Sequence, residues 1–311
     1  MNAPRHSPQD SIVAKYYIET KENLAKVAKE LVVLETTAKW TGQGDPTDLY
    51  LDSVGEVLEV EEIEPGKGFI SLLYPISNFD LEESAFPCLW LSMIGGPTFA
   101  LASYEKSRLV DFSIPKEMMD RFPGPAFGID GTRELMGLKH GELMIGTIVT
   151  PTAGMTAKEV ADLAYHAASG GICFIKDDEK MMNPPYCPLG ERVRLVSNAL
   201  RQIEGETGQK VLYMAHISTR TDKILDRAFE ALENGATGLM VNFFSTGFAA
   251  LQILREHPDI QVPIYAHCGG REAMGRATGQ GIAPSVIVKM VRLLGGDYFR
   301  AGMFESYLVD T

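Results

Sequence analysis

The stretch GGICFIKDDE, Gly170 to Glu179, joins a short apolar run to an abrupt cluster of charges. The apolar run, residues 172–175, is bounded by glycines and predicts a buried strand, because runs of this length are typical of strands covered on both faces. The charged residues that follow it cannot lie in a core, since an unpaired buried charge is costly. They form either a solvated turn or a site that needs oxygen ligands.

Similar apolar runs recur along the second half of the chain, with amphipathic stretches between them. We expect strands at residues 144–149, 171–175, 211–215, 238–241, 262–266 and 298–303. We expect helices at residues 155–171, 190–204, 222–234, 248–257 and 284–294, the first of them with a capping box formed by Thr156 and Glu159. Strands that alternate with helices indicate parallel βαβ units, which occur both in open doubly wound sheets and in closed (β/α)8 barrels.

Polar or reactive residues follow several of the expected strands, and this favours the barrel. In such barrels the active site gathers at the carboxyl ends of the strands. Only about six units are visible, so we expect a (β/α)8-type barrel that lacks strands 7 and 8 in this chain. The residues that follow strands are Thr150, Lys176 to Glu179, His216, Asn242 and His267.

The first part of the chain shows a mixed pattern of helix-like and strand-like segments. A helix is expected at residues 21–34 and strands at residues 55–63, 68–74 and 110–114, whereas the apolar segment 89–102 fits either. The stretch FPGPAFGIDG, residues 122–131, is a connector rich in proline and glycine. We therefore expect an N-terminal α+β domain at residues 1–135 and a barrel domain at residues 136–311.

Composition excludes several classes of protein. The chain has 311 residues and a net charge of −12, which disfavours nucleic-acid binding because such binding needs many lysines and arginines. No apolar run reaches the roughly 18 residues of a membrane span, and the start lacks the apolar core of a signal peptide. The four cysteines show no CxxC spacing. We expect a cytoplasmic protein that binds neither nucleic acid nor membrane.

The charged cluster itself has two interpretations. In extended chain Lys176 and Asp178 project to one side and Asp177 to the other. Two carboxylates, Asp178 and Glu179, suit Mg²⁺, which takes few protein oxygens and keeps several waters. Lys176 carries the wrong charge for such a site unless it reacts with CO₂ to give a carbamate, which is a third anionic ligand. The alternative is a solvated acidic turn with a local salt bridge.

Motifs along the whole chain resemble those of the ribulose bisphosphate carboxylase (RuBisCO) large subunit and of RuBisCO-like proteins. This resemblance implies a ferredoxin-like N-terminal α+β domain, a C-terminal barrel and a homodimer or higher homo-oligomer whose active sites are shared between subunits. It also implies Mg²⁺ bound by Asp178, Glu179 and carbamylated Lys176. The matching motifs are TTAKWT, GPAFGI, GTIVTPTAGMTAKEVADLAYHAASGG, GGICFIKDDE, MVNFFSTGFAAL, IYAHCGG and VRLLGGDYFRAG.

The chain also departs from the family pattern at functional positions. Thr150 and Thr152 replace two active-site lysines, and the first of those lysines is needed for carboxylation because it transfers protons and polarises the substrate. Cys268 replaces a phosphate-binding arginine and Arg300 replaces a histidine. These replacements argue strongly against CO₂ fixation.

The resemblance assigns roles to further residues. His267 is expected to be catalytic, as a substrate hydrogen-bonding or acid–base group, although a lone histidine is more often a satisfied strand-end residue. Arg271 and Arg300 are candidates for replacement phosphate contacts, with surface salt bridges as the alternative. The other expected substrate-binding residues are Thr150, His216 and Asn242, together with Glu35 and Trp40, which the resemblance places in the neighbouring subunit's site.

The function implied is Mg²⁺-assisted enolisation of a phosphorylated ketose or keto-acid sugar, as in an isomerase or tautomerase. The first alternative is decarboxylation or carboxyl transfer on a branched acid-sugar phosphate, because both reactions pass through an enediolate. The second is a family member that binds a sugar phosphate without catalysis. Retention of Lys176, Asp178 and Glu179 in one chain speaks against this last alternative.

Overall fold

The computed structural model describes residues 4–101 and 103–300. By internal contacts it divides into two compact units: unit 1 contains residues 4–122 and 271–289, and unit 2 contains residues 123–270 and 290–300. The domain boundary near residue 135 stays a prediction. Within the described residues, no helix combines the length and apolar character needed to cross a bilayer.

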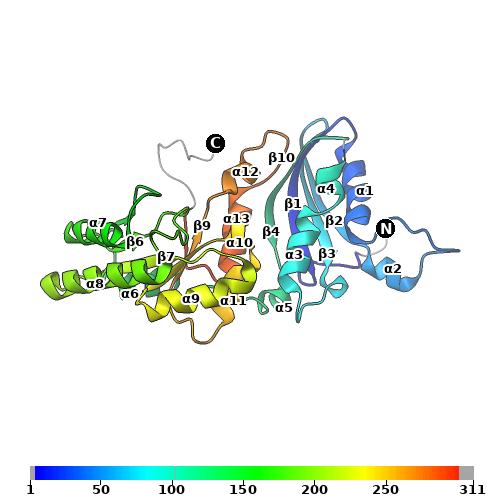
Figure 1. Cartoon of the computed structure of the whole chain (residues 1–311). Helices are drawn as coiled ribbons and strands as arrows, with labels where there is room; N and C mark the ends of the chain where they lie inside the picture. The colour runs from blue at the N-terminus through cyan, green and yellow to red at the C-terminus, as the bar shows by residue number, and fades with distance from the viewer. Residues whose placement is uncertain (1–3, 102, 301–311) are drawn as a thin grey trace. The chain divides into compact units, whose positions relative to one another are not determined.

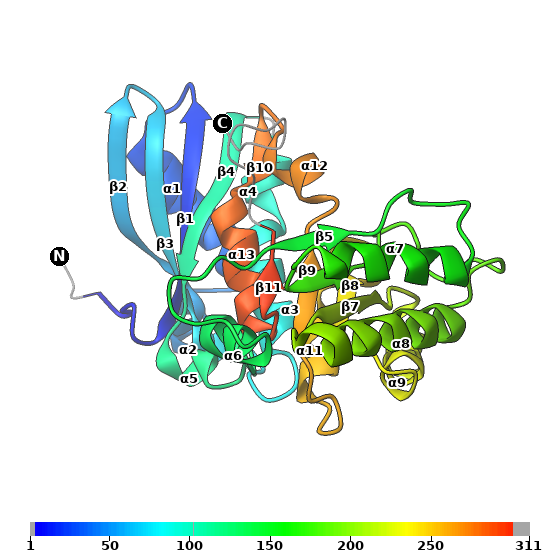
Figure 2. The same ribbon diagram turned by 90° about the vertical axis from the view of Figure 1, so that its left-hand side faces the viewer.

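Unit 1 is built on a five-stranded sheet with the strand order β10-β4-β1-β3-β2. Strand β1 pairs antiparallel with both β3 and β4, β2 pairs antiparallel with β3, and β10 runs parallel to β4. Figure 2 shows these strands side by side with helix α1 behind them. The strands are β1 (Ser11–Thr20), β2 (Glu56–Glu64), β3 (Lys67–Pro75), β4 (Tyr104–Ser113) and β10 (Gln280–Ile282).

Helices complete unit 1, and one of them resolves an ambiguity of the sequence. Helix α1 begins after its N-cap Asn23, whose side chain accepts a hydrogen bond from the backbone N–H of Lys26. The apolar segment 89–102, which fitted either helix or strand, contains the second half of helix α3 and the short helix α4. The helices are α1 (Leu24–Thr36), α2 (Asp48–Ser53), α3 (Ala85–Ile94), α4 (Pro97–Ala100), α5 (Lys116–Met119) and α12 (Arg271–Gly275).

Unit 2 contains a six-stranded, all-parallel sheet with the strand order β11-β9-β8-β7-β6-β5. Within the sheet each strand pairs with the next one along the chain, which is the arrangement of consecutive strands in a (β/α)8 barrel and confirms the predicted α/β class. Residues 301–303 of the predicted last strand lie outside the described residues. The strands are β5 (Gly146–Ile148), β6 (Phe174–Lys176), β7 (Leu212–His216), β8 (Gly238–Asn242), β9 (Ile264–His267) and β11 (Tyr298–Phe299).

The helices of unit 2 follow the predicted alternation. Helix α7 has the predicted capping box, in which the side chains of Thr156 and Glu159 each bond the other's backbone N–H. Helices α7, α8 and α9 lie side by side in chain order (Figure 1). The helices are α6 (Gly128–Leu135), α7 (Ala157–Ser169), α8 (Leu189–Thr207), α9 (Ile224–Glu233), α10 (Phe243–Thr246), α11 (Ala249–Glu256) and α13 (Pro284–Leu293), which crosses from unit 1 into unit 2.

One face of the parallel sheet carries a buried apolar layer. The alternation of side chains along the strands determines which residues follow this layer on the same face. The layer packs against residues that follow helix α6, and its strand residues include Met214, Met240, Tyr265 and Tyr298, with Phe174 partly buried against them. Side chains two residues further along a strand point to the same face. On four strands those residues are Lys176, His216, Asn242 and His267.

Candidate active site

Lys176 is the last residue of β6, and its side chain is almost fully buried. Its Nζ donates a hydrogen bond to the carbonyl oxygen of Asp177 at 3.2 Å and lies 3.6 Å from Glu179 Oε2. It also lies 5.9 Å from the centre of the Tyr265 ring. Burial lowers the pKa of the Lys176 amine, and the neighbouring carboxylates only partly oppose this effect. The site therefore shifts the balance toward the neutral amine, which is the form that reacts with CO₂.

This lowered pKa predicts how stability depends on pH. Between the folded-state pKa of Lys176 and its usual value of about 10.5, the unfolded chain binds the extra proton, so stability rises with pH. We expect wild type to gain stability relative to Lys176→Met as pH rises toward about 10.5. Urea unfolding in buffer free of Mg²⁺ and CO₂ measures this difference. A difference that does not change with pH would contradict the burial argument.

His267 ends strand β9 and faces Glu179, with 3.2 Å between His267 Nε2 and Glu179 Oε2. The other ring nitrogen, Nδ1, accepts a hydrogen bond from the backbone N–H of Gly269 at 3.1 Å. Burial, aided by the charge of Lys176, lowers the pKa of His267 to about 4, so the ring is neutral near pH 7. Because Nδ1 is used as an acceptor, the proton lies on Nε2 and points at the carboxylate.

Asn242, at the end of β8, holds the segment that follows His267. Its Nδ2 donates to the carbonyl oxygen of Gly269 at 2.8 Å and lies 3.4 Å from His267 Nδ1. Its Oδ1 accepts from the backbone N–H of Ser245 at 2.8 Å and so caps helix α10. These contacts of the amide fix the strand end.

His216, at the end of β7, joins the same network through Ser218. The two side chains are 2.6 Å apart, and Ser218 Oγ also accepts from the backbone N–H of Asn242 at 2.8 Å. The Nδ1 atom of His216 is buried without a hydrogen-bond partner among the described residues. Burial lowers the pKa of His216 to about 4, so this ring is also neutral near pH 7.

Asp178 and Glu179 supply oxygens that fit Mg²⁺, and the positive charge of Lys176 opposes such a site unless the amine becomes a carbamate. Asp178 is nearly buried and accepts from the backbone N–H of Lys180 at 2.8 Å through one oxygen, Oδ1. In the described ranges, no three His, Cys, Asp or Glu side chains are grouped to hold a metal ion. A carbamate on Lys176, together with Asp178 and Glu179, completes an all-oxygen donor set of the kind that Mg²⁺ prefers.

Two other predicted residues belong to unit 2. Thr150 is exposed and comes two residues after the end of β5. Arg300 lies close enough for its charge to help lower the pKa of His267. Contacts of Thr150 and Arg300 with a substrate stay predictions.

The remaining three predicted residues belong to unit 1. Glu35 accepts a hydrogen bond from the backbone N–H of Thr98 at 2.6 Å, and burial raises the pKa of its carboxyl group. The Trp40 ring packs edge-on against Tyr50, with 5.0 Å between ring centres. Arg271 begins helix α12, is 2% exposed, and its Nη2 lies 3.1 Å from Oε1 of the next residue, a glutamate.

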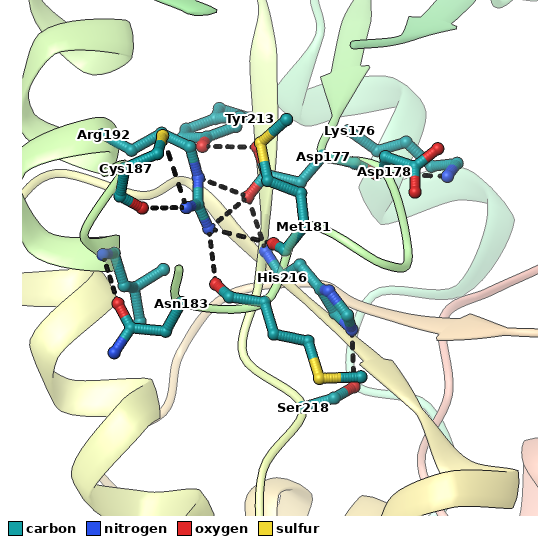
Figure 3. A network of polar contacts seen from close by, with 12 residues as sticks. Lys176, Asp177, Asp178, Met181, Asn183, Cys187, Arg192, Tyr213, His216 and Ser218 are labelled. Atoms are coloured by element: carbon teal, nitrogen blue, oxygen red, sulfur yellow. Dashed lines mark hydrogen bonds and ion pairs between the residues drawn. The ribbon is translucent and has the colours of Figure 1, made fainter. Parts of the chain in front are cut away.

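Asp177 has a partner that was not predicted from the sequence. This carboxylate is fully buried and forms an ion pair at 3.2 Å with Arg192 of helix α8, which is also fully buried. Figure 3 shows Arg192 and Tyr213 on one side of Asp177, with Lys176 and Asp178 on the other. The alternation that separates Asp177 from Lys176 already indicated a carboxylate facing the helices, where a buried charge requires a cation.

The fold and this site together define a class: a parallel (β/α)-barrel protein with a lysine and two carboxylates after its second barrel strand. The catalytic-domain model of the ribulose bisphosphate carboxylase large chain matches residues 128–310, and the N-terminal-domain model matches residues 3–118. The chain therefore belongs to the RuBisCO large-chain family. The resemblance seen in its motifs is confirmed.

Named relatives show the range of this family. An uncharacterized ribulose bisphosphate carboxylase-like protein of Bordetella bronchiseptica is 32% identical, over 93% of this chain and 71% of its own. The 3-oxo-isoapionate-4-phosphate decarboxylase of Rhizobium rhizogenes is 30% identical, over 93% of this chain and 72% of its own. The octameric RuBisCO of Pyrococcus horikoshii OT3 superposes with a TM-score of 0.88 at 27% identity, over 99% of this chain and 71% of its own.

Proposed function

We propose that this protein is a RuBisCO-like enzyme that enolises a phosphorylated ketose or keto-acid sugar and does not carboxylate. The observation that supports it best is the buried Lys176 amine, with its lowered pKa, beside Glu179 and His267. A salt bridge on a solvated surface requires neither a buried lysine nor a neighbouring histidine that is kept neutral by a lowered pKa.

Lys176 as a carbamate, Asp178 and Glu179 would hold Mg²⁺, which when bound acts as a Lewis acid that stabilises an enediolate. His267 acts through its Nε2–H group, because the backbone N–H of Gly269 occupies Nδ1. In place of Glu179, a substrate oxygen where negative charge develops could accept the hydrogen bond of this group. Arg300, an arginine in the second unit's last described position, suits a phosphate group of the substrate.

We expect no carboxylation of ribulose bisphosphate. Thr150 and Thr152 offer no ammonium where the family's carboxylases have lysines, and threonine does not titrate in the range needed. Incubation with labelled CO₂, Mg²⁺ and ribulose bisphosphate should leave no label in acid-stable product. Label in phosphoglycerate would refute the non-carboxylating assignment.

The enolisation itself is tested by solvent exchange. With Mg²⁺ and bicarbonate, the enzyme should exchange deuterium from D₂O into the carbon next to the carbonyl of a phosphorylated ketose. Exchange should disappear when the metal is chelated. A panel of ketose and keto-acid sugar phosphates that shows no metal-dependent exchange would count against the proposal.

Decarboxylation of a branched acid-sugar phosphate is the second candidate. It is supported by the similarity to the Rhizobium decarboxylase, and loss of CO₂ from a 2-hydroxy-3-keto acid leaves an enediolate. Release of CO₂ from such a substrate distinguishes decarboxylation from isomerisation.

We also propose a homo-oligomer, in which Glu35 and Trp40 reach the partner's site. The octameric Pyrococcus relative supports this proposal.

A further inference from the structure

Asp177 ties the end of the catalytic strand to its neighbours. Its Oδ1 accepts from the Tyr213 hydroxyl at 2.8 Å, and its Oδ2 accepts from the backbone N–H of His216 at 3.0 Å. Oδ2 also accepts from Arg192 Nε at 3.2 Å. These contacts connect β6, β7 and helix α8 at a point adjacent to Asp178 and Glu179 (Figure 3).

Arg192 uses the rest of its guanidinium to hold the segment between β6 and α8. Its Nη1 donates to the carbonyl oxygen of Cys187 at 3.0 Å, and its Nη2 donates to those of Met182 at 3.0 Å and Met181 at 3.3 Å. Residues 177–188 contain no helix or strand, so these carbonyls have no ladder partners. One buried side chain thus satisfies three carbonyls of this irregular segment.

We infer that Arg192 and Asp177 are positioning residues that fix segment 178–188, the segment that carries Asp178 and Glu179. The pair satisfies its own charges internally, so its effect on the site is through the backbone that it holds. Lysine cannot replace Arg192 here. The carboxylate and the three carbonyls are arranged around the planar guanidinium group, and a single ammonium group cannot reach all of them.

A second buried pair in the same unit provides a matched control. Arg255 and Asp297 lie 2.6 Å apart with side chains 5% and 0% exposed. Arg255 also donates to the carbonyl oxygens of Gly295 at 3.2 Å and Val262 at 3.3 Å. Both carbonyls lie just before strands, at their amino ends, whereas segment 178–188 follows the carboxyl end of β6. Substituting Arg255 therefore repeats the chemistry of substituting Arg192 away from the site.

The test is hydrogen exchange on the full chain without metal, comparing Arg192→Lys with Arg255→Lys. Arg192→Lys should speed amide exchange in segment 178–188 by about tenfold or more, with Lys180, Met181 and Cys187 as reporters. Their amides donate to Asp178 Oδ1, Asp178 O and Pro184 O within the segment. Arg255→Lys should leave these amides at the wild-type rate. Equal exchange of the segment in the two variants would overturn the inference.

The second arm rests on the proposed function. Residues that orient metal ligands typically change metal affinity by about 10–100-fold, so Arg192→Lys should weaken Mg²⁺ binding by that factor while Arg255→Lys leaves it unchanged. If wild type binds no Mg²⁺, the proposed function fails but the exchange result still decides the positioning role. If Arg192→Lys does not fold, Tyr213→Phe removes one contact to Asp177 and should speed exchange in the same segment by a few-fold. No increase there would equally overturn the inference.

Discussion

Lys176→Ala should reduce turnover by at least about 100- to 1,000-fold, the scale seen when one preorganised charge-stabilising group is removed. The substitution removes the buried amine that would form the proposed carbamate beside Asp178 and Glu179. Folding should be retained, because the buried ammonium is disfavoured in the folded state, as the lowered pKa of Lys176 shows. Metal-dependent deuterium exchange measures turnover, and the urea midpoint measures stability.

Lys176→Glu is the informative companion to this variant. It places a carboxylate near the position of the proposed carbamate and should recover weak Mg²⁺ binding that no longer depends on bicarbonate. Activity of Lys176→Ala within tenfold of wild type, in protein shown to be folded, would mean that the charged cluster is only a turn.

Asp297→Ala should lower the free energy of unfolding by about 3–5 kcal/mol, as expected when one partner of a buried ion pair is removed. Arg255 would remain buried without its counter-ion. Three backbone N–H groups that now donate to Asp297, those of Phe127, Gly128 and Ile264, would also lose their acceptor. Urea unfolding of unit 2, followed by fluorescence and far-UV circular dichroism, measures the loss.

Asp297→Asn is the control for charge alone. It keeps the shape and one carbonyl acceptor, so its cost should lie between those of wild type and Asp297→Ala. A loss below about 1 kcal/mol for Asp297→Ala would show that the buried pair contributes little here, as exposed pairs do.

Most of unit 2 could be predicted from the sequence because each element has a strong local pattern. The strand expected at residues 171–175 overlaps β6 (Phe174–Lys176), and the capping box at Thr156 and Glu159 appears where it was expected. The alternation of side chains along a strand also placed Lys176 and Asp177 on opposite sides, and their contacts in the structure agree. Periodicity and capping are local properties, so no knowledge of the fold is needed to read them.

What the sequence did not reveal depends on distant parts of the chain. Strand β10 has three residues and exists because residues 280–282 pair with β4. The predicted strand at residues 110–114 was the end of a longer strand, β4. Strand β1 was missed although Ile12, Ala14 and Ile18 alternate with less buried residues, a pattern that could have found it. The Arg192 contacts were missed because three of them go to backbone carbonyl oxygens. Every residue has a backbone carbonyl, so no residue type in the sequence marks such a contact.

The central claim is that Lys176, Asp178 and Glu179 hold Mg²⁺ only after Lys176 is carbamylated. Isothermal titration of Mg²⁺ into wild type, with and without bicarbonate, tests it most directly. The carbamate adds a third anion that repels the two carboxylates unless a cation is present, so carbamate and metal should bind cooperatively. We predict clearly tighter Mg²⁺ binding with bicarbonate in wild type and no such difference in Lys176→Ala. Equal affinity in both conditions would contradict the account.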